Sequence, residues 1–117
     1  MNLKLQEELD LLHAQICGAV SDPKRIMILY LLKDGSKTVS QLMNEMELTQ
    51  PAISRNMKIL KERNMVTVQR EGKNLVYSLR DHRVIEALDL FRAMLLDMIE
   101  SQAALARALS ADIKIQN

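Results

Sequence analysis

Apolar residues recur along most of this chain at spacings of three and four, which is the pattern of amphipathic helices. Residues 26–32 are apolar on nearly all sides, so we expect a buried central helix there, with Asp22 as its cap and Pro23 in its first turn. A narrower apolar stripe precedes it near the N-terminus and consists of Leu5, Leu9, Leu12 and Ile16.

Two short helices are predicted between residues 38 and 60. Thr38 and Gln41 make the capping-box pattern that opens the first of them. Thr49 can cap the second, and Pro51 suits its first turn because a proline there removes no helical hydrogen bond. Only a short link separates the two. This spacing predicts a helix-turn-helix, in which the second helix enters the DNA major groove.

The second of these helices has two distinct faces. Ile53, Met57 and Leu60 recur at i, i+4 and i+7 and predict a buried side. Polar residues on the remaining surface can hydrogen-bond base edges and phosphates. The residues that we expect to contact DNA from this helix and its start are Thr49, Gln50, Pro51, Ser54, Arg55, Asn56 and Lys58. Taken alone, the segment could equally be an ordinary amphipathic surface helix.

A β-hairpin is predicted directly after this helix. Residues 65–70 and 75–79 are rich in Val, Thr, Tyr and Leu, and Glu71-Gly72-Lys73-Asn74 lies between them as a turn. A hairpin in this position is a wing, which needs the neighbouring helices for stability. Arg70 and Lys73 flank the turn and are long enough to reach phosphates or an adjacent minor groove. We therefore add both to the DNA-binding set.

The C-terminal part predicts one long helix, capped by Asp81 and running over about residues 81–109. Its apolar residues step by four and three in a heptad seam, the pattern of a helix that packs against another helix. At about 28 residues the helix would be roughly 42 Å long, more than one small domain can cover. We expect a homodimer whose interface combines this seam with the N-terminal stripe: Leu5, Leu9, Leu12, Ile16, Leu88, Phe91, Leu95, Met98, Gln102 and Leu105.

In their order and residue sequence, these motifs resemble the ArsR/SmtB family of winged-helix repressors. The resemblance covers roughly residues 9–100, and its runs are 20–26, 28–32, 49–55, 60–66, 70–73 and 76–79. It implies a mainly α-helical winged helix-turn-helix with five helices and one two-stranded wing, dimerising through its N- and C-terminal helices. It also implies a bacterial or archaeal repressor that leaves DNA when a ligand binds or a cysteine is oxidised.

Composition is compatible with this picture. The 117 residues fit a single domain over 1–117, and a hydrophobic content of 48% suffices for a core. With one Phe, two Tyr, no Trp and eight Met, that core is expected to be aliphatic and rich in Met. There is no membrane-spanning run and no signal segment, and a single Cys fits a reducing compartment. We therefore expect a cytoplasmic protein without a membrane partner.

Charge is distributed unevenly although the chain carries only +1 overall. Residues 55–83, which hold most of the second helix and the wing, contain 8 basic and 3 acidic side chains. The flanking segments, 1–54 and 84–117, are each acidic on balance. A merely solvated charged surface does not predict this concentration on the two elements that a winged helix presents to DNA. The pattern favours double-stranded DNA as partner, with a pseudo-palindromic operator for a dimer.

The inducing signal is not apparent from the residues. Where the best-known metal site of the resembling family has Cys-Val-Cys, this chain has Thr38-Val39-Ser40. A second family site begins with Asp and His, as Asp81 and His82 do, but needs a later His that this chain lacks. We expect neither a metal site nor a cofactor. As the resemblance implies, we expect a small-molecule or redox effector, whose identity the sequence does not give.

One pair of residues keeps a weaker metal hypothesis open. His13 and Cys17 stand at i and i+4, a spacing at which two side chains can share an ion. The favoured interpretation is that Cys17 is a small buried hydrophobe and His13 a surface residue, because free Cys is among the most buried residue types. A redox role for Cys17 is the other alternative.

The function favoured by these observations is a homodimeric, sequence-specific transcriptional regulator, most simply a repressor. The alternative is a winged-helix protein-interaction module that does not bind DNA and uses its long helices to hold another protein. An enzyme is not expected, because the sequence has no Gly-rich phosphate loop, no nucleophile motif and no paired carboxylates with a shared pocket.

Overall fold

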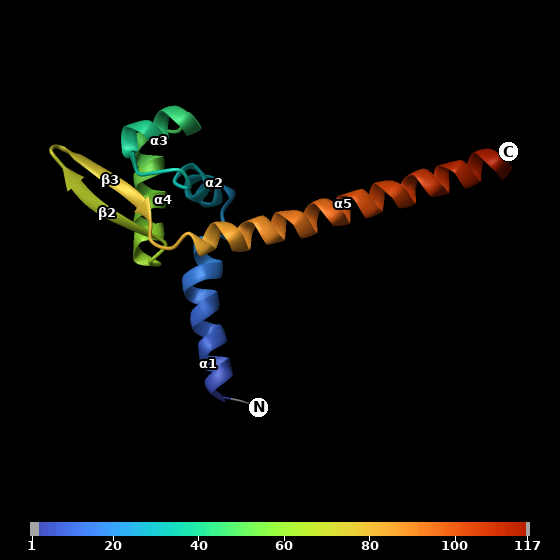
Figure 1. Cartoon of the computed structure of the whole chain (residues 1–117), viewed down its shortest axis with the longest axis horizontal. Coiled ribbons are helices and arrows are strands. Elements are labelled where there is room, and N and C mark those ends of the chain that lie inside the picture. The colour runs from blue at the N-terminus through green and yellow to red at the C-terminus, as the bar shows by residue number, and fades with distance from the viewer. Residues whose placement is uncertain (1–2, 117) are drawn as a thin grey trace. The chain divides into compact units, whose positions relative to one another are not determined.

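The computed structural model describes residues 3–116 and consists mainly of helices (Figure 1). Residues up to His82 form one compact unit, and those from Arg83 onward form a second. In chain order the elements are α1 (Leu3–Leu12), the π-helical turn η1 (His13–Cys17), α2 (Pro23–Leu31), β1 (Lys37–Thr38), α3 (Val39–Met46), α4 (Gln50–Glu62), β2 (Val66–Glu71), β3 (Asn74–Leu79) and α5 (Arg83–Gln116). The five helices and the β2–β3 wing confirm the predicted fold class.

The helix starts follow the capping signals in the sequence. The Asp22 side chain accepts a hydrogen bond of 2.8 Å from the Lys24 N–H at the start of α2. At α3 the capping box is complete, because Thr38 Oγ1 accepts from the Gln41 N–H at 3.2 Å and Gln41 Oε1 accepts from the Thr38 N–H at 2.8 Å. Local side chains thus satisfy helix N–H groups that would otherwise lack partners.

The wing belongs to a sheet of three strands, in the order β1-β3-β2. The short strand β1 pairs antiparallel with β3, with Lys37 opposite Tyr77. Sequence patterning predicted only the hairpin, because a strand of two residues is too short to show an alternation of its own. The β2–β3 ladder extends to the pair Glu71 and Asn74, so the loop is tighter than predicted and contains only Gly72 and Lys73. Gly72 has φ 62°, a conformation that glycine adopts without steric cost.

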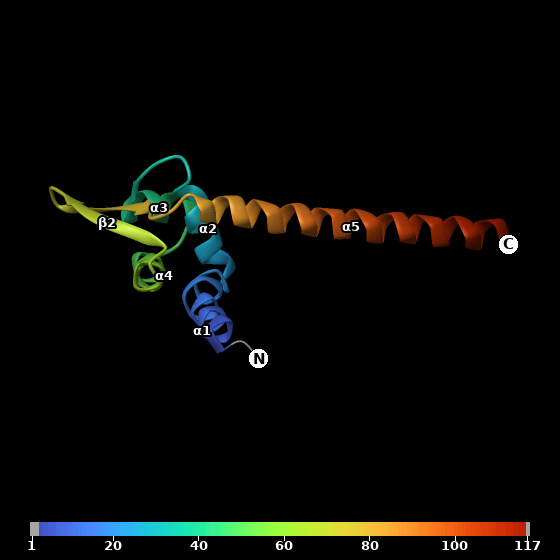
Figure 2. The same ribbon diagram turned by 60° about the horizontal axis from the view of Figure 1, so that its bottom comes forward.

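The core of the first unit is formed by α2, α3, α4 and the sheet, and Figure 2 shows the hairpin lying beside α4. The expectation of an aliphatic core is confirmed, whereas the expectation that it is rich in Met is wrong. Only Met57 and Met65 are buried among the described methionines, and Met27, Met94 and Met98 are more than half exposed. The fully buried large side chains are Ile28, Leu29, Leu32, Leu42, Ile53, Met57, Leu60 and Val66.

The second unit is the single helix α5 of 34 residues. It begins two residues later and ends seven residues later than the predicted span of about 81–109. The sequence contains no glycine or proline after residue 81 that would stop a helix near 109, so the seam pattern underestimated its length. Among residues 3–116 no helix combines the length and the apolar character that a membrane crossing requires.

Candidate nucleic-acid interface

The helix-turn-helix is formed by α3, a short link and α4. The link turns at Glu47, which has a left-handed backbone with φ 54°. At the start of α4 the Ala52 N–H donates to Thr49 Oγ1 at 3.4 Å, and Pro51 lies in the first turn. The predicted start of the second helix is confirmed. α3 and α4 pack against each other, so α4 is held by its buried side.

Helix α4 presents one buried and one exposed side. Ile53, Met57 and Leu60 are 0% exposed and form its buried face. The exposed side carries hydrogen-bonding and cationic groups, so it can offer donors to base edges and phosphates without any rearrangement of the core. The exposed residues on this helix and at its start are Thr49, Gln50, Pro51, Ser54, Arg55 and Lys58.

Asn56 does not lie with this exposed set. Its residue is only 7% exposed, its Oδ1 accepts a hydrogen bond from Arg25, and its Nδ2 donates to the Ala52 carbonyl. Asn56 was predicted to contact DNA because it is polar. Its position contradicts that placement, since 53, 56, 57 and 60 follow the i, i+3, i+4, i+7 spacing of one helix face. We therefore remove Asn56 from the candidate interface.

The wing contributes a second cationic surface. Arg70 lies opposite Leu75 near the tip of the hairpin, and Lys73 is in its two-residue loop. Both residues are exposed, as is Glu71 between them. Both predicted wing residues therefore lie at the exposed tip of the hairpin.

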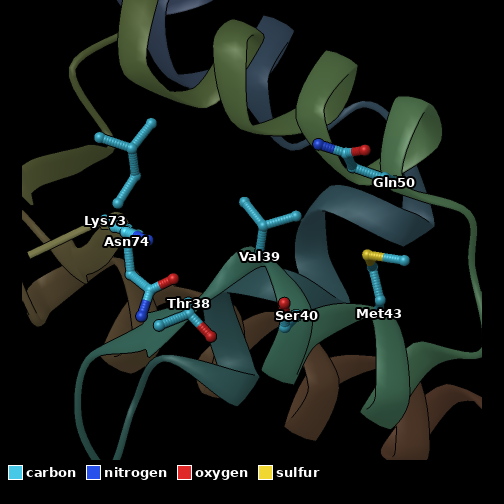
Figure 3. A pocket seen from close by; sticks show the side chains of 8 residues that line it. Thr38, Val39, Ser40, Met43, Gln50, Lys73 and Asn74 are labelled. Atoms are coloured by element: carbon cyan, nitrogen blue, oxygen red, sulfur yellow. The ribbon is translucent and has the colours of Figure 1, made fainter.

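A cavity of about 440 Å³ lies between α3, the start of α4 and the wing, and sequence reasoning did not find it. Figure 3 shows Val39 and Met43 of α3 reaching toward α4, with Gln50 of α4 above them. Polar groups border the apolar floor on the wing side. The lining residues are Thr38, Val39, Ser40, Met43, Gln50, Lys73, Asn74 and Leu75. Only Gln50 and Lys73 had been selected from the sequence, because the others become neighbours through the pairing of β1 with β3.

Cys17 and His13 lie in the π-helical turn η1, and both are exposed. The expectation for His13 is confirmed, whereas the interpretation of Cys17 as a buried hydrophobe is wrong. The two residues therefore do not have the α-helical spacing from which the metal hypothesis was argued. Within residues 3–116 no group of three or more His, Cys, Asp or Glu side chains is placed to hold a metal ion.

The predicted dimer surfaces remain open in the single chain. The α1 and η1 stripe of Leu5, Leu9, Leu12 and Ile16 is 44–50% exposed. On α5 the exposed seam residues are Phe91, Leu95, Met98, Gln102 and Leu105. Leu88 differs from them because it is only 8% exposed, so it is already buried before any partner binds. Leu88 therefore offers little surface for a second copy to cover.

Comparison with known proteins identifies the same segment. The sequence pattern of the family described as "Bacterial regulatory protein, arsR family" matches residues 22–68, which span α2, α3, α4 and the start of β2. An uncharacterized HTH-type transcriptional regulator of Methanocaldococcus jannaschii is 40% identical over 78 residues, which are 66% of this chain and 88% of that protein. The family match contains both helices of the helix-turn-helix.

Two further comparisons concern a repressor and a solved structure. The HTH-type transcriptional repressor SmtB of Mycobacterium tuberculosis is 33% identical over 70 residues, or 60% of this chain, and the match spans only 52% of that protein. A homodimeric winged helix-turn-helix DNA-binding domain of Mycobacterium bovis, solved by NMR, superposes with a TM-score of 0.73. It is 23% identical and covers 86% of this chain and 92% of that one, which supports the fold assignment.

Proposed function

The chain belongs to the arsR family of bacterial regulatory proteins and is a winged helix-turn-helix transcriptional regulator, and we propose that it acts as a homodimeric repressor. Relatives that carry the name repressor support this proposal, as does the homodimeric M. bovis domain. Because the family consists of transcriptional regulators, an enzymatic function is not favoured. The same membership argues against an interaction module that lacks DNA binding.

The observation that carries the proposal is the separation of the two sides of α4. Its apolar side is fully buried and its polar side is exposed, so the polar side can contact DNA without any unfolding of the helix. We propose that Gln50, Ser54 and Arg55 read base edges in the major groove, while Lys58 contacts phosphates. Thr49 and Pro51 would fix the start of the helix at the groove.

The wing and the cavity extend the proposed interface. Arg70 and Lys73 would follow the DNA backbone or enter a minor groove. The cavity between α3, α4 and the wing has Lys73 at its border, so a phosphate of the bound DNA would lie there beside the positive charge of Lys73. Together these elements would contact one half of a pseudo-palindromic operator.

The DNA-reading role is tested with Arg55→Ala and a matched variant, Lys61→Ala. Lys61 is an exposed cation in the last turn of the same helix, whereas Arg55 lies near the end that enters the groove in helix-turn-helix proteins. With a duplex selected from random DNA by the wild-type protein, we expect Arg55→Ala to cost about 1–3 kcal/mol of binding. Lys61→Ala should cost less, and neither should alter thermal melting. Equal binding by Arg55→Ala would remove this side of α4 from the interface.

The homodimer is tested on α5. Leu95 lies on the exposed apolar seam, and Ala93 lies on the opposite side of the same helix and is also exposed. Burying an unpaired charge costs several kcal/mol, so Leu95→Glu should shift the protein to monomer in sedimentation, whereas Ala93→Glu should not. A monomer reads only one half-site and should bind the selected duplex with nearly non-specific affinity. A monomeric Leu95→Glu protein with full operator affinity would contradict the dimeric mechanism.

Salt dependence separates the repressor from the interaction module. Binding through phosphates releases counterions and weakens steeply as salt increases, whereas an apolar helix interface does not.

We further propose that a small molecule or an oxidant releases the repressor, and that it acts in the cytoplasm, where the operator would be.

A further inference from the structure

Arg25 is a buried cation in the middle of the winged-helix unit. It belongs to α2 and is only 8% exposed. Positions 25, 28, 29 and 32 follow the spacing of one helix face, so the guanidinium lies on the same side as Ile28 and Leu29. A buried cation is costly unless its N–H groups are bonded. The partners of Arg25 therefore indicate what it holds together.

Those partners come from two places in the chain, the segment 18–22 and Asn56 of α4. Arg25 Nε donates to the Ala19 carbonyl at 2.8 Å, and Nη2 donates to the Gly18 carbonyl at 3.3 Å and to Ser21 Oγ at 3.2 Å. Nη1 donates to Asn56 Oδ1 at 3.3 Å. The Asp22 carboxylate, 3.8 Å from Nη1, balances the charge. One planar guanidinium thus joins the backbone just after η1 to α4, which is the proposed DNA recognition helix.

Asn56 completes the connection from the side of α4. While Oδ1 accepts from Arg25, Nδ2 donates to the Ala52 carbonyl at 2.9 Å, one turn earlier in the same helix. The amide is consequently bonded through both its oxygen and its nitrogen. A single orientation of this side chain satisfies both partners, so the bond to Arg25 connects the second turn of α4 to α2.

A second contact ties the same backbone to the other end of α4. Arg63 caps the C-terminus of α4, and its guanidinium lies against Gly18, where a Cβ atom would collide with it. Gly18 and Ala19 are therefore bonded by an arginine of α2, and Gly18 is also approached by Arg63, the C-cap of α4. They directly follow the helical segment that carries Leu9, Leu12 and Ile16.

We infer that Arg25 and Asn56 are a buried positioning pair. The pair fixes the orientation of α4, the proposed DNA-reading helix, relative to η1, which ends the N-terminal helical segment proposed for dimerisation. The inference rests on the proposed function, because the pair lies outside the proposed DNA interface and acts on that interface through α4. Neither residue touches DNA in this arrangement. The pair acts through α4, so it governs how well the exposed side of α4 fits a specific sequence and leaves contacts to phosphates in general nearly unchanged.

The first test compares Asn56→Ala with Asn56→Asp. An aspartate still accepts from Arg25 and makes a stronger, charge-assisted bond, although it loses the bond to the Ala52 carbonyl. At a temperature where each variant is folded, Asn56→Ala should bind the wild-type-selected duplex about tenfold more weakly, which is ~1.4 kcal/mol, and a random duplex within about twofold of wild type. Asn56→Asp should retain more specific affinity than Asn56→Ala. If Asn56 faced DNA phosphates, the aspartate would be the weaker binder, and that result would overturn the inference.

The second test is a double-mutant cycle with Arg25→Lys. Lysine keeps the charge but cannot present the planar fork that reaches both residues 18–22 and Asn56. Because both residues act through one bond, Arg25→Lys with Asn56→Ala should bind no more weakly than the weaker single variant. Fold-losses that multiply would show independent roles and contradict the pair.

Hydrogen exchange in the free protein separates this inference from the proposed function. In Asn56→Asp, amides of residues 18–20 and of the first turns of α4 should retain more protection than in Arg25→Lys, and in Arg25→Lys both groups should lose protection together. Exchange that changes in only one of the two segments would refute the pair. If the wild-type protein selected no sequence from random DNA, the proposed function would fail, while the exchange result would still decide whether the pair links these segments.

Discussion

The wing provides the most quantitative test of the proposed interface, through Arg70→Ala combined with Lys73→Ala. Both side chains are exposed near the tip of the hairpin, and neither belongs to the buried core, so stability should hardly change. Each phosphate that a cation neutralises contributes about 0.9 to the slope of log affinity against log salt concentration. If both residues contact phosphates, the double variant should lose about 1.8 from that slope.

The difference is large enough for a simple assay. Over a fourfold rise in salt, from about 50 to about 200 mM, a slope change of about 1.8 alters the relative affinity of wild type and variant by roughly twelvefold. Fluorescence anisotropy of a labelled duplex at five or six salt concentrations measures it. Because the slope counts charges, the exchange Arg70→Lys with Lys73→Arg should leave it unchanged. An unchanged slope in the double alanine variant, with unchanged melting, would refute the assignment of the wing to the DNA surface.

Substitutions at four positions test the scaffold by thermal or urea unfolding. Ile53→Ala should cost about 2–5 kcal/mol because its side chain is fully buried, whereas Ser54→Ala on the exposed side should stay within about 0.5 kcal/mol of wild type; equal costs would contradict the two-sided helix. Thr38→Ala should cost about 1 kcal/mol, since it removes half of the capping box; no loss would mean that water replaces the cap. Asn64 directly follows the C-cap of α4 and has a left-handed backbone with φ 61°, so Asn64→Gly should be tolerated while Asn64→Ala should cost about 1 kcal/mol; the reverse order would contradict this account.

Local signals predicted most of the winged-helix unit correctly. Thr38 with Gln41, Thr49 and Asp22 each mark a helix start through a hydrogen bond to a backbone N–H within three residues, so no distant part of the chain is needed. The buried side of α4 followed from periodicity alone. These features are visible in a sequence because they depend on its immediate neighbourhood.

Errors arose where a distant partner determines the environment of a residue. Asn56 is polar, yet it occupies an apolar-face position because Arg25, which is 31 residues away, bonds to it. Position 56 falls on the same helix face as Ile53, so its spacing was a better guide to its burial than its polarity. Cys17 shows the opposite case, because a residue type that is usually buried lies exposed in a π-helical turn. Strand β1 exists only through its pairing with β3, and no local pattern records that pairing.

The exposed apolar residues explain why assembly should require both predicted dimer helices. Phe91, Leu95, Met98 and Leu105 are each more than half exposed, so covering each gains about 1 kcal/mol, or roughly 8 kcal/mol for two copies. Association itself costs about 4–15 kcal/mol, so the α5 seam alone would give a marginal dimer.

The stripe of Leu5, Leu9, Leu12 and Ile16 adds a gain of similar size, again roughly 8 kcal/mol for two copies. A dimer that depends on this stripe must hold α1 and η1 in a defined position, and η1 leads directly into the backbone that Arg25 bonds. In the proposed repressor, a ligand or oxidant that displaced α1 would therefore weaken the dimer and loosen the recognition helix in the same step.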